Sequence, residues 1–125
     1  MRENYCVYRL KTIELTGASL DWAVAKCEGF YPFTDDISWI IEWEGQYISL
    51  PQYSTNWAQG GVIIEREWLD ITPWPNESDE DLRWQCVQHD SIDRVAFGPT
   101  PLIAAMRCYV MSRLGDEVDI PEGLK

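Results

Sequence analysis

The chain has 125 residues and a mass of 14.5 kDa, the usual size of one domain with its own hydrophobic core. Hydrophobic residues make up 46% of it and charged residues 25%, a globular composition that excludes wholesale disorder. The formal charge is −11 and the pI is near 4.3, which argues against direct binding to nucleic acid, because phosphates attract clustered cations. We therefore expect one domain, residues 1–125, without a nucleic-acid partner.

The N-terminal part predicts a strand and then a helix. The aromatic and β-branched segment from Tyr5 to Leu10 is typical of a strand. In the next segment, 15–29, Thr16 or Ser19 can cap the start of a helix, and Gly29 suits the position after its end. Apolar residues recur there with helical spacing and predict one buried stripe: Leu20, Ala23, Val24 and Cys27.

The middle of the chain predicts a β-hairpin, a loop and a further strand. Two apolar runs over 37–50 are separated by Glu44 and Gly45, the pattern of a hairpin. The alternation leaves open which face is the inner one: that of Trp39, Ile41 and Trp43, or that of Ile40 and Glu42. A loop of about ten residues is expected next, returning through two glycines into a strand over 62–67.

The C-terminal half predicts an acidic loop, two strands and a second helix. Segment 73–81 contains two prolines and several acids, so we expect an exposed loop. Short strands are expected at 83–88 and 94–97. Thr100 as N-cap, Pro101 in the first helical position and Gly115 after the end delimit the clearest helix of the sequence. The acidic tail is expected to dock only in part.

This order of elements predicts an α+β domain with a mainly antiparallel sheet of four to six strands and two α-helices packed on it. The second helix has a side of small residues that suits close packing, and together with the surplus of tryptophan this is compatible with a homodimer.

The cysteines and the hydropathy pattern indicate a cytoplasmic protein. Four cysteines occur without a CxxC pair, and we expect reduced thiols rather than disulfides or metal ligands: Cys6, Cys27, Cys86 and Cys108. No apolar run approaches the roughly 20 residues of a membrane span, and the N-terminus lacks a secretory apolar core. We therefore expect the cytoplasm and no membrane partner.

Motifs for catalysis or metal binding are scarce. His89 is the only histidine, so any triad would need it, and His89 with Asp90 alone cannot complete a metal ligand set. Acid pairs such as Asp35 with Asp36 are suited to acid–base chemistry, but a chain with 21 acids forms such pairs by chance. Phosphate-binding and dinucleotide-binding glycine motifs do not occur. We expect no catalytic residue, no metal and no cofactor.

Binding has more support, because the chain contains seven tryptophans. Trp57, Trp68 and Trp74 lie in or beside predicted loops, where an apolar plate with one hydrogen-bond donor suits ligand recognition. For Trp57 the alternative is a plug that covers the edge of the sheet.

A second candidate is the start of the C-terminal helix at 98–100, since free N–H groups and the helix dipole attract anions, although every helix has such a start. Arg66, Arg94 and Arg107 stand out against the acidic background. They either neutralise neighbours such as Glu65 or converge on a phosphate or carboxylate.

Three segments resemble the conserved blocks of a known family: LTGASLDWAVAKCEG, YSTNWAQGGVIIERE and GPTPLIAAMRCYVMSRLGDEV. They are similar to blocks of the NinX-like proteins of lambdoid phages and prophages, small domains of uncharacterised function. The resemblance covers most of the chain from Leu15 to Pro121. The family pattern commonly has an aspartate at the position of Asn56 and a proline at that of Val62. The missing carboxylate weakens an acid–base role for this loop and leaves binding by Trp57 unaffected.

The resemblance implies a phage accessory protein in the cytoplasm of the bacterial host without implying a mechanism. We expect a non-enzymatic protein that binds a small, nucleotide-like ligand, and sequestration of a host defence signal is the sharpest form of this hypothesis. Trp57 would stack on a base, polar side chains would read its edge, and an arginine would meet phosphate. The predicted ligand-binding residues are Tyr53, Asn56, Trp57, Gln59, Gly60, Gly61, Arg66, Gly98, Thr100 and Arg107.

The alternative is an acidic interaction module, or a nucleic-acid mimic, that binds a host protein. Its acidic surface, especially residues 77–81, would dock on a basic site, and salt would weaken this contact. An enzyme is the third hypothesis and requires His89 or a pair of carboxylates in a buried cleft.

Overall fold

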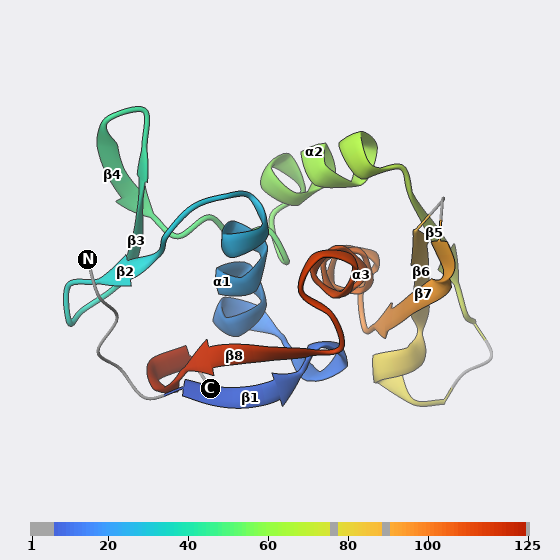
Figure 1. Cartoon of the computed structure of the whole chain (residues 1–125). Helices are drawn as coiled ribbons and strands as arrows, with labels where there is room; N and C mark the ends of the chain where they lie inside the picture. Colours follow the sequence, from blue (N-terminus) through green and yellow to red (C-terminus); the bar gives the residue numbers. More distant parts are fainter. Residues whose placement is uncertain (1–6, 76–77, 89–90, 125) are drawn as a thin grey trace.

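The computed structural model describes residues 7–75, 78–88 and 91–124, and the side chains of 91–94 are not part of this description. Within these residues, eight strands form three antiparallel sheets, and three α-helices lie among them (Figure 1). The predicted α+β class is confirmed. The strands are more numerous than expected, they form three sheets instead of one, and one helix was not predicted.

The two ends of the described chain form one sheet. Strand β1 (Val7–Lys11) pairs antiparallel with β8 (Glu117–Pro121), so the first and last strands of the chain lie side by side (Figure 1). Alternate β8 residues, Val118 and Ile120, are buried against the core. The tail is therefore a strand with a buried face, where only partial docking was expected. Short 3₁₀ helices follow each strand, η1 (Thr12–Glu14) and η3 (Glu122–Leu124).

Helix α1 (Gly17–Cys27) agrees with the sequence prediction. The Ser19 hydroxyl accepts from the Thr16 N–H at 3.3 Å and donates to the Thr16 carbonyl at 2.8 Å, which fixes the first turn. Gly29 follows the C-terminal end with φ +93°, a conformation that favours glycine. Three members of the predicted stripe are fully buried: Leu20, Ala23 and Val24.

The middle sheet contains the predicted hairpin. Its strand order is β2 (Phe33–Thr34), β3 (Trp39–Trp43), β4 (Gln46–Ser49). Glu44 and Gly45 both have positive φ, as a two-residue hairpin turn requires. Ile41 is 1% exposed, so the face of Trp39, Ile41 and Trp43 is the inner one. The far end of the hairpin projects from the body of the molecule (Figure 1).

The stretch predicted as a loop and a strand is a helix, α2 (Trp57–Glu67). The Asn56 side chain caps it by accepting from the Ala58 N–H at 2.9 Å. The predicted strand at 62–67 was wrong, and so was the loop through Gly60 and Gly61. Glycines and β-branched residues have low helix propensity, and burial of residues 60 and 63 on one face outweighs this preference.

The third sheet has the order β5 (Leu69–Pro73), β6 (Trp84–Gln88), β7 (Ser91–Gly98). Strands β6 and β7 were predicted. Strand β5 was not, because a short segment with Asp70 and Pro73 has a weak strand signal, and Pro73 is tolerated at the end of an edge strand. The helix η2 (Glu80–Leu82) lies in the predicted acidic loop.

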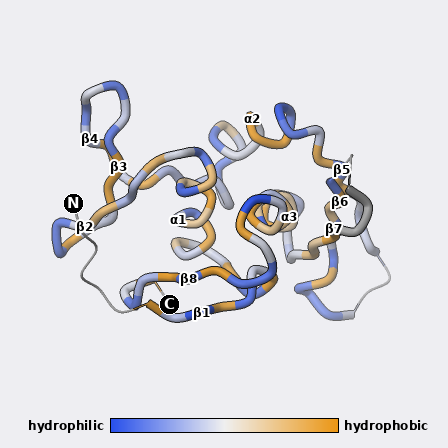
Figure 2. The backbone as a smooth tube through the Cα atoms, viewed as in Figure 1, coloured by the Kyte–Doolittle hydropathy of each residue, from blue (hydrophilic) through white to orange (hydrophobic). Residues whose placement is uncertain are grey.

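Helix α3 (Pro101–Leu114) is the centre of the molecule. Thr100 caps it by accepting from the Ile103 N–H at 3.1 Å, Pro101 begins it and Gly115 ends it, as predicted. It packs on the β5–β7 sheet and against α1, and its small-residue side is covered within the chain: Ala104, Ala105 and Cys108 are fully buried. Hydrophobic segments of α1, α3 and β8 meet around this core, while the tip of the β3–β4 hairpin is hydrophilic (Figure 2).

Two further expectations concern the thiols and the membrane. Cys27, Cys86 and Cys108 form no disulfide, as predicted, and Cys6 lies outside the described residues. No helix in the described ranges is long and apolar enough to cross a membrane.

Candidate functional site

The predicted ligand-binding loop begins with two buried residues. Tyr53 is 7% exposed and Ser54 is 1% exposed. The Ser54 N–H donates to Asp21 Oδ1 at 2.8 Å, which ties the loop to α1. Burial, followed by the charges of Glu28 and Asp21, raises the pKa of Tyr53 to about 12. Tyr53 therefore belongs to the core.

The next predicted residues form the first turns of α2. Trp57 is 55% exposed at the first helical position, and Asn56 is the N-cap. Gln59 Oε1 accepts from the Gln52 N–H at 2.7 Å, which closes the loop on itself. Gly60 packs so closely that a Cβ there would lie 2.2 Å from the Tyr53 carbonyl oxygen, whereas a Cβ on Gly61 would meet only Trp57, at 3.7 Å. Asn56, Trp57 and Gln59 are exposed, and Trp57 is the large apolar side chain among them.

The start of α3 is equally engaged in internal contacts. A Cβ on Gly98 would lie 2.7 Å from the Ala104 backbone nitrogen, so glycine is required there by close packing. Arg107 is 3% exposed and donates to the carbonyl oxygens of Leu15 and Phe97, each at 2.8 Å. It also forms an ion pair with Asp81 at 3.1 Å. Arg107 thus joins three segments of the fold.

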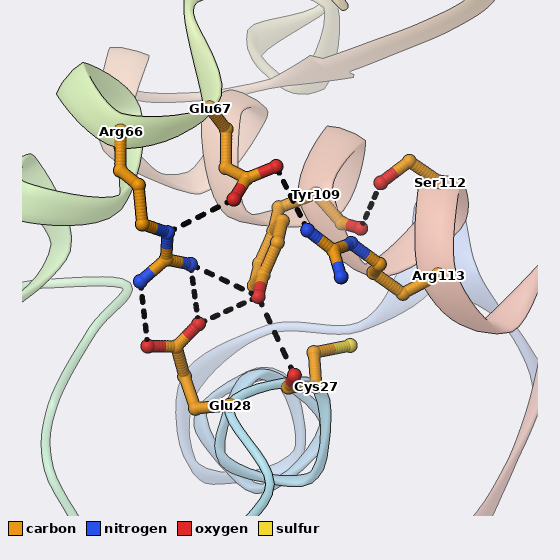
Figure 3. A network of polar contacts seen from close by, with 7 residues as sticks. All are labelled: Cys27, Glu28, Arg66, Glu67, Tyr109, Ser112 and Arg113. Carbon is orange, nitrogen blue, oxygen red and sulfur yellow. Dashed lines mark hydrogen bonds and ion pairs between the residues drawn. The ribbon is translucent and has the colours of Figure 1, made fainter.

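Arg66 belongs to a polar network between the three helices (Figure 3). Its guanidinium binds the Glu28 carboxylate in a bidentate manner, at 3.0 and 2.6 Å, and contacts Glu67 at 2.9 Å. The Tyr109 hydroxyl donates to Glu28 at 2.5 Å and accepts from Arg66 at 3.1 Å. Arg113 binds the other oxygen of Glu67 at 3.0 Å. This network links the C-terminal ends of α1 and α2 to α3.

The charges of this network balance one another. Burial opposes ionisation of Glu28, but hydrogen bonds from Arg66 and Tyr109 outweigh it and lower the pKa of the Glu28 carboxyl. Glu67 behaves likewise: burial is outweighed by Arg66 and Arg113, and its pKa is lowered. The guanidinium carbons of both arginines lie over the Tyr109 ring, at 5.7 and 5.2 Å from its centroid.

The structure does not bring the two predicted arginines together. Arg66 contacts Tyr109, and Arg107 lies two residues away on α3, about 200° around the helix. Both neutralise carboxylates of the chain, which is one of the two roles the sequence left open. Four residues named in the sequence-based hypotheses cannot be placed. Residues 77, 89 and 90 lie outside the described ranges, and the side chain of Arg94 is not described. A pocket shared by Trp57 and Thr100 stays a prediction.

A cavity of 410 Å³ lies instead at the start of α1. The loop before α2 borders it through Gln52 and Thr55, and the middle sheet contributes Trp39 and Ser49. Its lining residues are Gly17, Ala18, Asp21, Trp39, Ser49, Leu50, Gln52 and Thr55. Small-molecule sites commonly have this size and this mixture of an aromatic wall with a few polar groups.

Asp21 is the charged residue in this lining. Asp21 is only 6% exposed, and no lysine or arginine of the described chain forms an ion pair with it. Burial raises the pKa of the Asp21 carboxyl, and hydrogen bonds with Ser54 offset only part of this effect. The Ser54 N–H occupies one acceptor position, which leaves the ionised carboxylate capacity for further donors.

Asp21, Glu28 and Tyr109 were not among the predicted site residues. The sequence does contain a signal for Asp21. This acid stands inside the apolar helical run LDWAVA, and the helical spacing places its side chain on the buried face or beside it. No local pattern marks Glu28 and Tyr109, because they are 81 residues apart in sequence. Among the described residues, no group of three or more His, Cys, Asp or Glu side chains is arranged to hold a metal ion.

Comparison with known proteins identifies the family. No curated protein matches the sequence. A family model described as Bacteriophage P22, NinX, matches residues 11–113. This range includes all of α1 and α2 and the polar network up to Arg113. Because the match covers well over half of the chain, the protein belongs to the NinX family of phage proteins.

Proposed function

We propose that this phage protein is a non-enzymatic binding protein, and that the cavity at the start of α1 holds a planar aromatic ligand with two adjacent N–H groups, such as the edge of a guanine base. The observation that carries this proposal is the Asp21 carboxylate, which is buried beside a cavity of 410 Å³ without a cationic partner in the described chain. A buried carboxylate is costly unless donors compensate it. A ligand with paired N–H groups supplies them.

The remaining lining supports the same class of ligand. Trp39 offers an aromatic face on which a planar base can stack. Gly17 and Ala18 are the first residues of α1, where backbone N–H groups have no helical acceptor and are suited to a ligand carbonyl. Guanine combines these features, since its carbonyl oxygen lies next to two N–H donors.

The cavity does not favour phosphate. Its lining contains one carboxylate and no lysine or arginine, so a nucleoside is a better ligand than the phosphate-bearing nucleotide that the sequence alone suggested. Sequestration of a host nucleoside-type signal would be a suitable task for a phage protein with such a site.

Isothermal titration calorimetry with guanosine, inosine and adenosine tests the proposal. Guanosine should bind more tightly than inosine, which lacks one donor, and adenosine should bind least. Asp21→Asn should weaken guanosine binding roughly tenfold or more, because an amide offers one acceptor where the carboxylate offers two. Ala18→Leu, which places bulk in the cavity from an exposed position, should also weaken it.

Glu65→Gln is the matched control, since it makes the same change of charge at an exposed position of α2 and should leave the affinity unchanged. Absence of heat with all three nucleosides would remove the proposal. Equal affinity of the wild-type protein and Asp21→Asn would do the same.

A further inference from the structure

A second hollow, of 560 Å³, lies on the middle sheet, and the proposed nucleoside site does not involve it. Four aromatic residues and two acids dominate its lining: Phe30, Tyr31, Phe33, Tyr47, Glu42 and Glu44. Tyr31 is 81% exposed and Tyr47 is 70% exposed, so these rings are largely in solvent. Exposed aromatic side chains grouped around a hollow are typical of interaction sites.

Strand register explains why these residues meet. Phe33 of β2 pairs with Ile40 of β3, and Tyr47 of β4 pairs with Glu42 of β3. Ile40 and Glu42 are two residues apart on one strand, so all of these side chains share one face of the sheet. The Phe33 and Tyr47 rings contact edge to face, with centroids 5.7 Å apart. The turn after α1 adds Phe30 and Tyr31 to the lining.

This arrangement suits a cation. Aromatic faces attract ammonium and guanidinium groups, and the two glutamates add negative charge. The chain already shows such a contact at the rim, where Lys26 Nζ lies 5.3 Å from the centroid of the Tyr31 ring and 5.5 Å from the centroid of Trp22. The net charge of −11 would steer a positively charged partner toward the protein.

The sheet edge indicates that the cation belongs to a peptide segment. Strand β4 is at the end of the strand order β2-β3-β4, so in the described chain it has one neighbouring strand only. An extended segment can pair with such an edge and direct alternate side chains onto the sheet face. The hairpin projects from the body of the molecule, which leaves room for a partner (Figure 1).

We infer that the hollow between Tyr31, Tyr47 and Glu42 is a docking site for an arginine or lysine side chain on an extended basic segment of a partner protein. This site differs from the acidic loop 77–81 that the sequence suggested for a protein partner, because it combines carboxylates with aromatic faces and a free strand edge.

Chemical-shift titration of the ¹⁵N-labelled full chain tests this inference. The probes are capped pentapeptides, Gly-Val-Xaa-Val-Gly, with arginine, lysine or glutamine at the centre. The arginine and lysine peptides should shift residues 31, 42 and 47, and the glutamine peptide should not. Tyr47→Ala and Glu42→Gln should each weaken binding roughly threefold to tenfold. Both side chains are exposed, so the variants should remain folded, and thermal unfolding checks this.

Two further variants separate docking from general attraction. Lys26→Gln removes the competing cation and should strengthen binding, whereas Glu65→Gln changes the same charge as Glu42→Gln at a distant site and should have no effect. Equal binding of the arginine and glutamine peptides would overturn the inference. So would an equal effect of Glu65→Gln and Glu42→Gln. Guanosine binding should not change in Tyr47→Ala, so the two proposed sites can fail separately.

Discussion

Helix α1 carries a carboxylate near each end, and the two have opposite surroundings. Glu28 at the C-terminal end binds Arg66 and Tyr109, and its pKa is lowered. Asp21 in the N-terminal half accepts the Ser54 N–H, has no cationic partner in the described chain, and its pKa is raised. One carboxylate is therefore stabilised in its ionised form, and the other is destabilised.

This difference separates structure from candidate function. A network that satisfies its own charges, as around Glu28, has little capacity left for a ligand and serves to hold the helices together (Figure 3). A buried acid beside a cavity weakens the fold, and proteins commonly accept such a cost at binding sites. For this reason we place the proposed ligand at Asp21 and not at the arginines.

The largest effect on stability is expected where α2 packs against the loop of Tyr53 and Ser54, the loop that is hydrogen-bonded to Asp21. Gly60→Ala would place a Cβ 2.2 Å from the Tyr53 carbonyl oxygen and 2.8 Å from Leu102, so the backbone must move. We expect a loss of roughly 2–3 kcal/mol in the free energy of unfolding, measured by urea denaturation. Gly61→Ala is the control and should stabilise α2 by about 0.5–1 kcal/mol, since its Cβ meets nothing closer than 3.7 Å. Equal effects of both substitutions would contradict the proposed close approach.

The second effect concerns the Glu28 end of α1. Glu28→Gln removes the charge that binds Arg66 and Tyr109, and we expect a loss of about 1–2 kcal/mol at pH 7, below the full value of charged hydrogen bonds because Arg66 is 45% exposed. Conservative replacement of an unpaired exposed acid, Glu14→Gln, should change stability by less than about 0.5 kcal/mol. Denaturant titrations of both variants provide the measurement.

The loss in Glu28→Gln should depend on pH. Because the folded-state pKa of Glu28 is lowered, its stabilisation is fully present above the usual value of 4.5 and disappears as the pH falls through the folded-state pKa. Wild-type and variant unfolding curves should therefore converge at strongly acidic pH. A difference that stays constant from pH 7 to pH 2 would show that the charge of Glu28 is not the cause.

The smallest effect should have the opposite sign. Asp21→Asn keeps an acceptor for the Ser54 N–H and removes a buried charge, so we expect a gain on the order of 1 kcal/mol at pH 7. Because the pKa of Asp21 is raised, its favourable contribution exists below the usual value of 3.8 and is lost as the pH rises through the folded-state pKa. The gain should therefore vanish at acidic pH. Destabilisation at pH 7 would contradict the contrast with Glu28.

The sequence predicted elements with clear local signals. Helices α1 and α3 have capping residues at both ends, and the hairpin turn at Glu44 and Gly45 has residues suited to positive φ. The strand predicted at 62–67 was wrong, since these residues belong to helix α2. Their β-branched side chains favour a strand, and Asn56 as a cap gives only a weak helix signal. The predicted ligand-binding residues stay a prediction, and the cavity beside α1 is bordered by Gln52 and Thr55, which were not among them.

The sequence by itself determined the α+β class, the ends of two helices, the hairpin and the NinX family, because these depend on local chemistry and on runs of neighbouring residues. Only the tertiary structure decided which charges have partners. Arg66 and Glu28 are 38 residues apart, and Asp21 and Ser54 are 33 apart, so their contacts exist only after the helices have packed. Burial and distance then set whether a carboxylate is neutralised within the chain or left facing a cavity.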